Sequence, residues 1–143
     1  MSRAESVEVF AAFPDRLAAA ARAAADRPVA PGEWGPAEVV RHLIAVEDQV
    51  WHVRFGQLAA GERPRWSWTE PGQAAGYDDA PLEAVLAGFA AERAINVATI
   101  RAFDDDGWAR SGTHETYGVL DVAGLLQLAN DHGDEHLEGL AAD

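Results

Sequence analysis

The sequence predicts an all-α fold, a four-helix bundle, from two observations. Apolar residues recur at the three- and four-residue steps of a helix in four separate segments of the 143-residue chain. No segment shows the alternation of a strand, and none has the Asn-Gly signal of a tight hairpin. Because 48% of the residues are hydrophobic, the chain can bury a core, and we expect residues 1–143 to form a single domain.

The first helical segment is alanine-rich and covers residues 3–26. Its apolar stripe contains Val9, Phe10, Phe13 and Leu17. Pro14 removes one backbone donor, which predicts either a kink near Phe13 or the junction of two helices.

The second helical segment begins after Trp34, with Pro36 suited to its first turn. Its heptad-like stripe consists of Val39, Leu43, Val46, Val50 and Val53. At about 100° per residue, His42 lies at the edge of this stripe and can reach the bundle interior. His52 points away from it and is predicted to be exposed.

Residues 61–79 have the composition of a loop, with several prolines and glycines, and they contain Trp66 and Trp68. Two tryptophans are costly to leave in water. We expect them either to close one end of the bundle or to form a pocket wall or a dimer contact.

Asp79 is predicted to cap the third helix, with Pro81 in its first turn. The core stripe of this helix is Leu82, Leu86, Phe89, Arg93, Asn96, Ile100 and Phe103. Arg93 and Asn96 interrupt it, and a buried polar group is costly unless it is paired. Either they satisfy a neighbouring helix or a buried carboxylate, or they line a polar cavity in which Arg93 would bind an anionic substrate group.

The segment Asp104–Gly107 is predicted to end the third helix, and the connection to the fourth runs over the surface as far as Asp121. Loops of this kind provide both binding residues and packing residues. Together with Arg93 and Asn96, the candidate substrate contacts are Trp108, Arg110, His114 and Tyr117.

The fourth helix is predicted to be capped by Asp121 and to place Leu125, Ala129, His132 and His136 on one face. The two histidines therefore continue the apolar stripe, and at a spacing of four their rings can converge on one metal ion. They could instead be hydrogen-bonded core residues. A metal site would need a third ligand from elsewhere in the chain.

Composition excludes several classes of function. The net charge of −13 would repel nucleic acids and anionic membranes, so neither is an expected partner. The absence of cysteine excludes disulfides, thiolate ligands and a protein thiol nucleophile. We find neither a signal peptide nor an apolar stretch of membrane-spanning length, and we expect a cytoplasmic protein.

Three groups of residues resemble the DinB superfamily, the YfiT-like metal-binding four-helix bundles. They are Trp34 with His42-Leu43, the stretch from Trp108 to His114, and His132-Gly-Asp-Glu-His136-Leu137. The resemblance implies an up-down-down-up bundle with a long crossover connection, often as a homodimer. It also implies that His42, His132 and His136 hold a divalent metal, Zn²⁺ or Ni²⁺. Members with known activity use a low-molecular-weight thiol as cosubstrate, and many members have no assigned activity.

Three neutral imidazoles leave a coordination position open, as catalytic sites do. A metal there would activate a thiol or a water molecule, because it stabilises the deprotonated form. The first hypothesis is therefore a thiol S-transferase acting on a small electrophile, with Arg93 and Arg110 orienting an anionic group. The alternatives are a metal-dependent hydrolase and a non-catalytic, stress-related metal-binding protein. Glu38 and Gln49 flank His42 and are candidate hydrogen-bond partners for it, but we expect both to lie on the surface instead.

Overall fold

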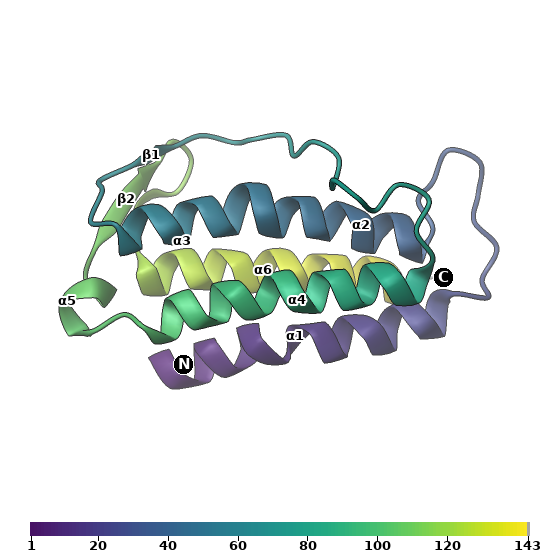
Figure 1. Cartoon of the computed structure of the whole chain (residues 1–143), viewed down its shortest axis with the longest axis horizontal. Helices are drawn as coiled ribbons and strands as arrows, with labels where there is room; N and C mark the ends of the chain where they lie inside the picture. Colours follow the sequence, from purple (N-terminus) through teal and green to yellow (C-terminus); the bar gives the residue numbers. More distant parts are fainter. Residues whose placement is uncertain (143) are drawn as a thin grey trace.

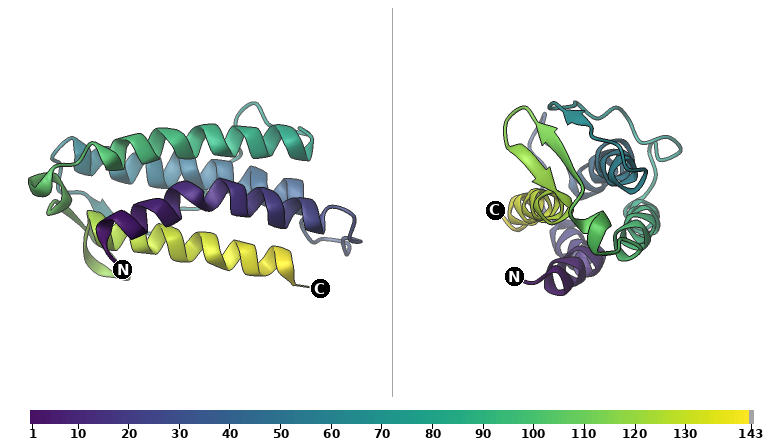
Figure 2. Two further views of the ribbon diagram at one scale, coloured as in Figure 1. Left: turned by 90° about the horizontal axis from the view of Figure 1, so that it is seen from below. Right: turned by 90° about the vertical axis from the view of Figure 1, so that its left-hand side faces the viewer.

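The computed structural model describes residues 1–142, and four long helical rods dominate this part of the chain (Figure 1). Viewed end-on, the rods are arranged side by side as a bundle (Figure 2). The second rod is continuous but contains three segments. The rods are α1 (Arg3–Ala24), then α2 (Pro36–Val46), η1 (Glu47–Trp51) and α3 (His52–Ala59), then α4 (Leu82–Arg101), and finally α6 (Val122–Ala141).

The rods follow an up-down-down-up course (Figure 1). Helix α1 and the second rod are antiparallel, and residues 60–81 then cross the length of the bundle. Helix α4 consequently runs parallel to the second rod, and α6 runs parallel to α1. The backbones of α1 and α6 lie close together, as do those of α2 and α4. This is the mainly helical bundle with a long crossover that was expected.

A small sheet joins the two long connections at one end of the bundle. Its strands are β1 (Arg65–Trp66), β2 (Ser111–His114) and β3 (Gly118–Asp121), in the order β1-β2-β3. Strand β1 pairs with β2 in parallel, and β2 pairs with β3 in antiparallel register. The expectation of no strands was therefore wrong. Segments of two to four residues are too short to show alternation, and the turn closes with Gly118 at a φ of 76° instead of an Asn-Gly pair.

Helix α1 starts with a capping box, in which the Ser2 hydroxyl accepts from the Glu5 amide at 3.1 Å. The helix continues through Pro14 as a single element and bends near its middle (Figure 2). Of the two outcomes expected from Pro14, the structure shows the bend and not a junction of two helices.

The second rod contains a π-helical turn, η1, which takes up an extra residue and rotates everything after it. Val53 is consequently 46% exposed, whereas Arg54, Phe55 and Leu58 are buried. The heptad-like stripe predicted from sequence holds as far as Val50 and fails beyond it. The same turn places the carboxylate of Glu47 inside the bundle, where it is 1% exposed.

The boundaries of α4 differ from those expected. Pro81, not Asp79, is its N-cap, and Asp79 lies in the preceding loop with a left-handed φ of 58°. The helix ends at Arg101, and Asp104 caps a further short helix, α5 (Asp105–Trp108), by accepting from the Gly107 amide at 2.7 Å. These are shifts of a few residues at helix ends.

The two tryptophans of the crossover have different environments. Trp66 is 6% exposed, and its indole nitrogen donates to Gln57 Oε1 at 2.8 Å. Its ring lies so close to Gly112 that a Cβ atom there would be 2.6 Å away. Trp66 therefore closes the end of the bundle, whereas Trp68 is 69% exposed.

None of the helices in residues 1–142 combines the length and the hydropathy that spanning a membrane requires.

Candidate metal centre

The imidazoles of His42, His132 and His136 meet between α2 and α6, although ninety residues separate the first from the second. One ring nitrogen of each lies within 4.8 Å of the others. The ring centroids of His132 and His136 are 4.7 Å apart, and those of His42 and His136 are 5.3 Å apart. Nitrogens that share one zinc ion are roughly 3.3 Å apart, given bonds of about 2.0–2.1 Å. Small side-chain rotations would bring the three rings to that spacing.

The surroundings of the three rings favour their neutral, metal-binding form. Burial lowers the pKa of each histidine, and it lowers the pKa of His136 to about 4, helped by the neighbouring His132 and His42. For His132, the proximity of His42, which would repel a second proton when protonated, and the positive charge of Arg93 lower the pKa further. The carboxylate of Glu70 partly offsets burial at His42. All three imidazoles are therefore neutral at pH 7 and have a lone pair available to a metal.

The rings are held by packing and not by hydrogen bonds. The ring centroids of Trp34 and His42 are 5.1 Å apart, and those of Trp51 and His132 are 6.1 Å apart. Within residues 1–142, no protein group is hydrogen-bonded to any of the three rings, although each is half-buried. By contrast, His114 Nδ1 accepts from the amide of Thr116 at 3.0 Å. Half-buried imidazoles without protein partners fit a metal site, because a cation would satisfy their lone pairs.

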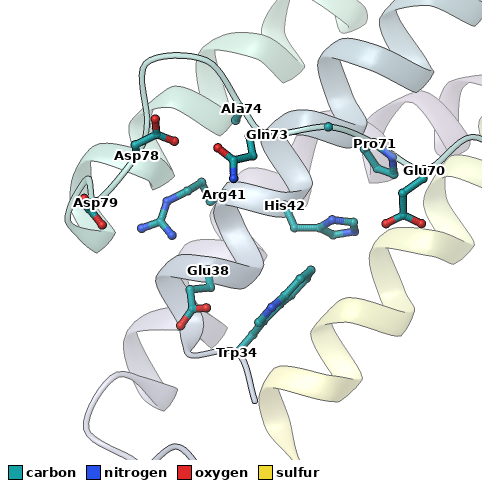
Figure 3. A pocket seen from close by; sticks show the side chains of 11 residues that line it. Trp34, Glu38, Arg41, His42, Glu70, Pro71, Gln73, Ala74, Asp78 and Asp79 are labelled. Carbon is teal, nitrogen blue, oxygen red and sulfur yellow. The ribbon is translucent and has the colours of Figure 1, made fainter. Parts of the chain in front are cut away.

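Two pockets adjoin this centre in the described part of the chain. One, of about 670 Å³, lies beside His42 under the crossover (Figure 3). The other, of about 740 Å³, lies beside His136 against the loop between α1 and α2. Trp34 lines both. The centre is therefore open to small molecules from two directions.

The crossover is fastened above the first pocket by side chains of α2 and η1. Gln49 accepts from the Gly72 amide at 2.7 Å and donates to the Gln73 carbonyl at 3.4 Å, and Arg41 donates to the Ala80 carbonyl at 3.2 Å. Gln49 therefore holds the loop by these hydrogen bonds. Glu38 accepts from the Gly35 amide at 3.3 Å, at the start of α2, and is exposed, as the surface alternative expected. Neither residue is hydrogen-bonded to His42.

Glu70 is a residue of this centre that the sequence analysis missed. It comes from the middle of the crossover, and its carboxylate points toward the ring of His42 (Figure 3). No periodicity or cap marks a loop residue of this kind, and its position depends on the course of the whole connection.

Arg93 and Asn96 were expected either to pair with a buried group of the protein or to line a polar cavity, and the structure shows the first. Arg93 donates to both carboxylate oxygens of Glu47 at 2.8 Å and to the Phe10 carbonyl at 2.9 Å. Asn96 donates to Glu47 Oε2 at 2.8 Å, and its Oδ1 lies 3.1 Å from Nδ1 of His52. Arg93 is 4% exposed, each of its three nitrogens donates to a protein acceptor, and it lines neither pocket beside the histidines.

The other four candidate substrate contacts lie toward the sheet end of the bundle, away from the three histidines (Figure 1). Trp108 is buried in the core, and Arg110 donates to the carbonyls of Leu58 and Ala59 at 3.0 Å. His114 is buried in β2, and Tyr117 is exposed in the hairpin turn. None of the four, and neither Arg93 nor Asn96, lines the pockets beside the histidines.

The fold and the site together define a class of protein. It is an up-down-down-up four-helix bundle with a candidate metal centre between its second and fourth rods.

The chain belongs to the DinB superfamily, whose family model matches residues 2–140. A comparison with curated protein sequences finds no significant match. Among solved structures, the chain is similar to YfiT from Bacillus subtilis, with 19% sequence identity and a TM-score of 0.74. The likeness covers 99% of this chain and 86% of YfiT, which is described as a probable metal-dependent hydrolase with an unusual four-helix bundle topology. At this identity the likeness establishes the fold.

Proposed function

We propose that this protein is a metal-dependent enzyme that transfers a low-molecular-weight thiol to a small electrophile. The observation that supports this best is the convergence of three unpaired, neutral imidazoles, those of His42, His132 and His136, beside two pockets. Membership of the DinB superfamily agrees with a metal at this place.

The donor set fits a divalent cation such as Zn²⁺ or Ni²⁺, both of which bind imidazole well. Among residues 1–142, the cluster of candidate ligands contains these three histidines only, which leaves a coordination position for a substrate. When bound, the cation supplies positive charge that lowers the pKa of a thiol or water molecule entering that position.

The protein's own residues would bind and orient the reactants. Trp34 and Trp51 pack against the rings of His42 and His132 and limit their rotation. The crossover covers one side of the pocket beside His42 and is held there by hydrogen bonds from Gln49. Since the chain has no cysteine, a nucleophilic sulfur must arrive with a cosubstrate, and a pair of pockets suits a reaction of two substrates.

Hydrolysis is the second candidate, and the likeness to YfiT favours it, since that protein is described as a probable metal-dependent hydrolase. Water would then take the place of the thiol at the same centre. The two reactions share the three histidines and differ in the nucleophile.

The test is a conjugation assay of zinc- or nickel-loaded protein with a panel of biological thiols and chlorodinitrobenzene. In this reaction a carbon–sulfur bond forms, and chloride and the thiol proton leave. A parallel arm without thiol measures hydrolysis of p-nitrophenyl acetate. Thiol-dependent turnover is expected from the wild type and from His52→Ala, whose histidine lies exposed on the second rod, and not from His42→Ala.

Turnover that does not exceed that of His42→Ala with any thiol would refute the transferase. Ester hydrolysis that requires His42 would then support the hydrolase. Activity in neither arm would leave a metal-binding protein without the proposed chemistry.

A further inference from the structure

We propose that the indole of Trp34 is a specificity-determining wall between two chemically different substrate compartments at this centre. The compartment beside His136 receives the apolar part of the electrophile, and the compartment beside His42 receives a hydrophilic cosubstrate. This assignment rests on the proposed two-substrate function and adds which reactant enters from which side.

The position of Trp34 is the first step. It stands just before Gly35, the N-cap of α2, and its ring centroid lies 5.1 Å from that of His42. The same side chain lines the pocket beside His42 and the pocket beside His136. In Figure 3 its indole projects toward the His42 ring on the side facing α6. A broad, stiff indole in this place separates the two spaces at the point where both reach the histidines.

The pocket beside His42 has a hydrophilic lining. Its polar side chains are Glu38, Arg41, Glu70, Gln73, Asp78 and Asp79. Within residues 1–142, none of its four carboxylates forms an ion pair with a protein cation. These groups stay hydrated when the pocket is empty, and an apolar ligand would have to remove that water without replacing its hydrogen bonds. A hydrophilic molecule with its own donors can replace them.

The pocket beside His136 has a more apolar lining than the pocket beside His42. Its apolar side chains include Ala24, Pro28, Val29, Pro36, Val39 and Leu140, and its charged ones are Arg27, Glu33 and Glu135. Rigid proline rings and branched side chains bury an apolar ligand at little cost in side-chain entropy. A small aromatic electrophile matches this surface.

The wall explains how one centre could keep two reactants apart until both reach the metal. Removal of the indole joins the polar and the apolar compartments, so each ligand gains access to the other's space. The expected consequence is a loss of discrimination between the two ligands, with the three histidines still present to hold the metal. Since Trp34 is 55% exposed and lies in a loop, its truncation removes little core packing.

The experiment measures binding residue by residue, independently of turnover. Zinc-loaded protein labelled with nitrogen-15 is titrated with benzyl alcohol as the apolar probe, and amide chemical shifts are followed by NMR. In the wild type, shifts are expected at Val29, Val39 and Gly139, which line the compartment beside His136, and not at Gly72 and Gln73 beside His42. In Trp34→Ala the shifts are expected in both groups.

Two variants serve as controls. Trp68→Ala removes an exposed tryptophan that lines neither pocket, and it should keep the wild-type pattern. Trp34→Phe keeps a smaller ring and should restore most of the separation. All titrations are made at saturating zinc, because Trp34 packs against His42 and its removal is expected to weaken zinc binding. The dispersion of the amide signals shows that each of the four proteins is folded.

Three results for the wild type would overturn the assignment. The probe could shift both groups of amides alike, it could shift neither group up to its solubility limit, or it could give the same pattern as in Trp34→Ala. In the conjugation assay, Trp34→Ala should lower the preference for apolar over polar electrophiles about tenfold or more in kcat/KM. A wild type without turnover refutes the proposed function, whereas the NMR pattern still decides whether Trp34 separates the compartments.

Discussion

At the scale of single residues, the histidines of this chain differ in their bonding partners. His114 and His52 have protein groups within hydrogen-bonding distance, whereas His42, His132 and His136 face one another. This difference identifies the candidate ligands better than the amount of burial does, because an imidazole that already bonds to protein has less to offer a cation.

Replacement of one of the three should therefore abolish tight metal binding. We expect His42→Ala to weaken zinc affinity by roughly a hundredfold or more, since a three-ligand site loses one donor. His52→Ala is the matched control on the same rod and should bind zinc as the wild type does. Competition with a chromophoric chelator measures both, and equal affinities would remove His42 from the site.

Gly133 lies between the two histidines of α6, where the helix touches α1. A Cβ atom there would meet the ring of Phe13 at 2.8 Å, so Gly133→Ala should destabilise the fold by about 1–3 kcal/mol through overpacking. Gly139 is in the same helix with nothing within 4 Å of an added Cβ atom. Gly139→Ala should instead stabilise by about 0.5–1 kcal/mol, through helix propensity alone.

Urea unfolding curves of the two glycine variants provide the measurement. The change in unfolding free energy is expected to have opposite signs in the two variants, although both replace a glycine of α6 by alanine. If Gly133→Ala were as stable as Gly139→Ala, the close approach of α1 to α6 would not be as tight as the structure shows.

At the scale of elements, the π turn η1 decides which side chains of the second rod face inward. It brings Glu47 to Arg93 and Asn96 of α4, and Arg93 also bonds the Phe10 carbonyl of α1. Three rods are thus fixed at one level by a single buried network. The guanidinium of Arg93 also lies 3.7 Å from the centroid of Phe10, which packs it on an aromatic face.

Breaking this network on one side should be costly. Arg93→Met leaves the carboxylate of Glu47 buried without its partner, and we expect a loss of about 3–5 kcal/mol in unfolding free energy. The double variant Glu47→Leu with Arg93→Met removes both charges and should recover most of that loss. Denaturant unfolding of the single and double variants checks this, and a double variant as unstable as the single one would contradict it.

The exposed ion pair between Arg22 and Glu83 provides the matched comparison. Its side chains are 59% and 65% exposed, and the shortest N–O distance is 2.6 Å. Water and salt screen such a pair, so Arg22→Met should leave stability nearly unchanged. The contrast with Arg93→Met separates the effect of burial from that of charge pairing itself.

At the scale of the whole molecule, the three histidines link stability to pH. In the metal-free protein their pKa values lie below the ordinary value of about 6.5, with that of His136 near 4. Above pH 6.5 both the folded and the unfolded forms are neutral, and the histidines have no effect. As the pH falls from about 6.5 toward about 4, the unfolded chain takes up protons and the folded one does not, so stability falls.

The midpoint of urea unfolding of the metal-free protein should therefore decrease across this range. His136→Gln, which cannot take up the proton, should show a shallower decrease than the wild type, while both share the effect of the carboxylates. If the unfolding midpoint fell equally with pH in both proteins, the pKa of His136 would not be lowered in the folded state.

Metal binding should also stabilise the molecule. An ion that binds the folded form at a hundred times its Kd adds about 2.7 kcal/mol, which for a domain of this size raises Tm by roughly 5–10 °C. Chelation should lower Tm by the same amount in the wild type and have no effect in His136→Ala. An unchanged Tm after confirmed removal of the metal would exclude a stabilising role for the site.

Much of this fold could be predicted from periodicity and from the resemblance to a known family. Leu125, Ala129, His132 and His136 share a face because the helical repeat places them there, whatever surrounds the helix. Other features could not be predicted. The π turn at Glu47 depends on a buried partner in α4, and the position of Glu70 depends on contacts that fasten the crossover at Gly72 and Gln73.

The sequence by itself determined the helical class of the protein and the two imidazoles of α6, since both follow from local spacing along the backbone. It also marked His42 as able to turn inward. Only the tertiary structure decided that His42 meets the other two, that Arg93 and Asn96 donate to Glu47, and that Trp34 lines two pockets. The physical reason is that each of these depends on packing between rods far apart in the chain, which no local pattern contains.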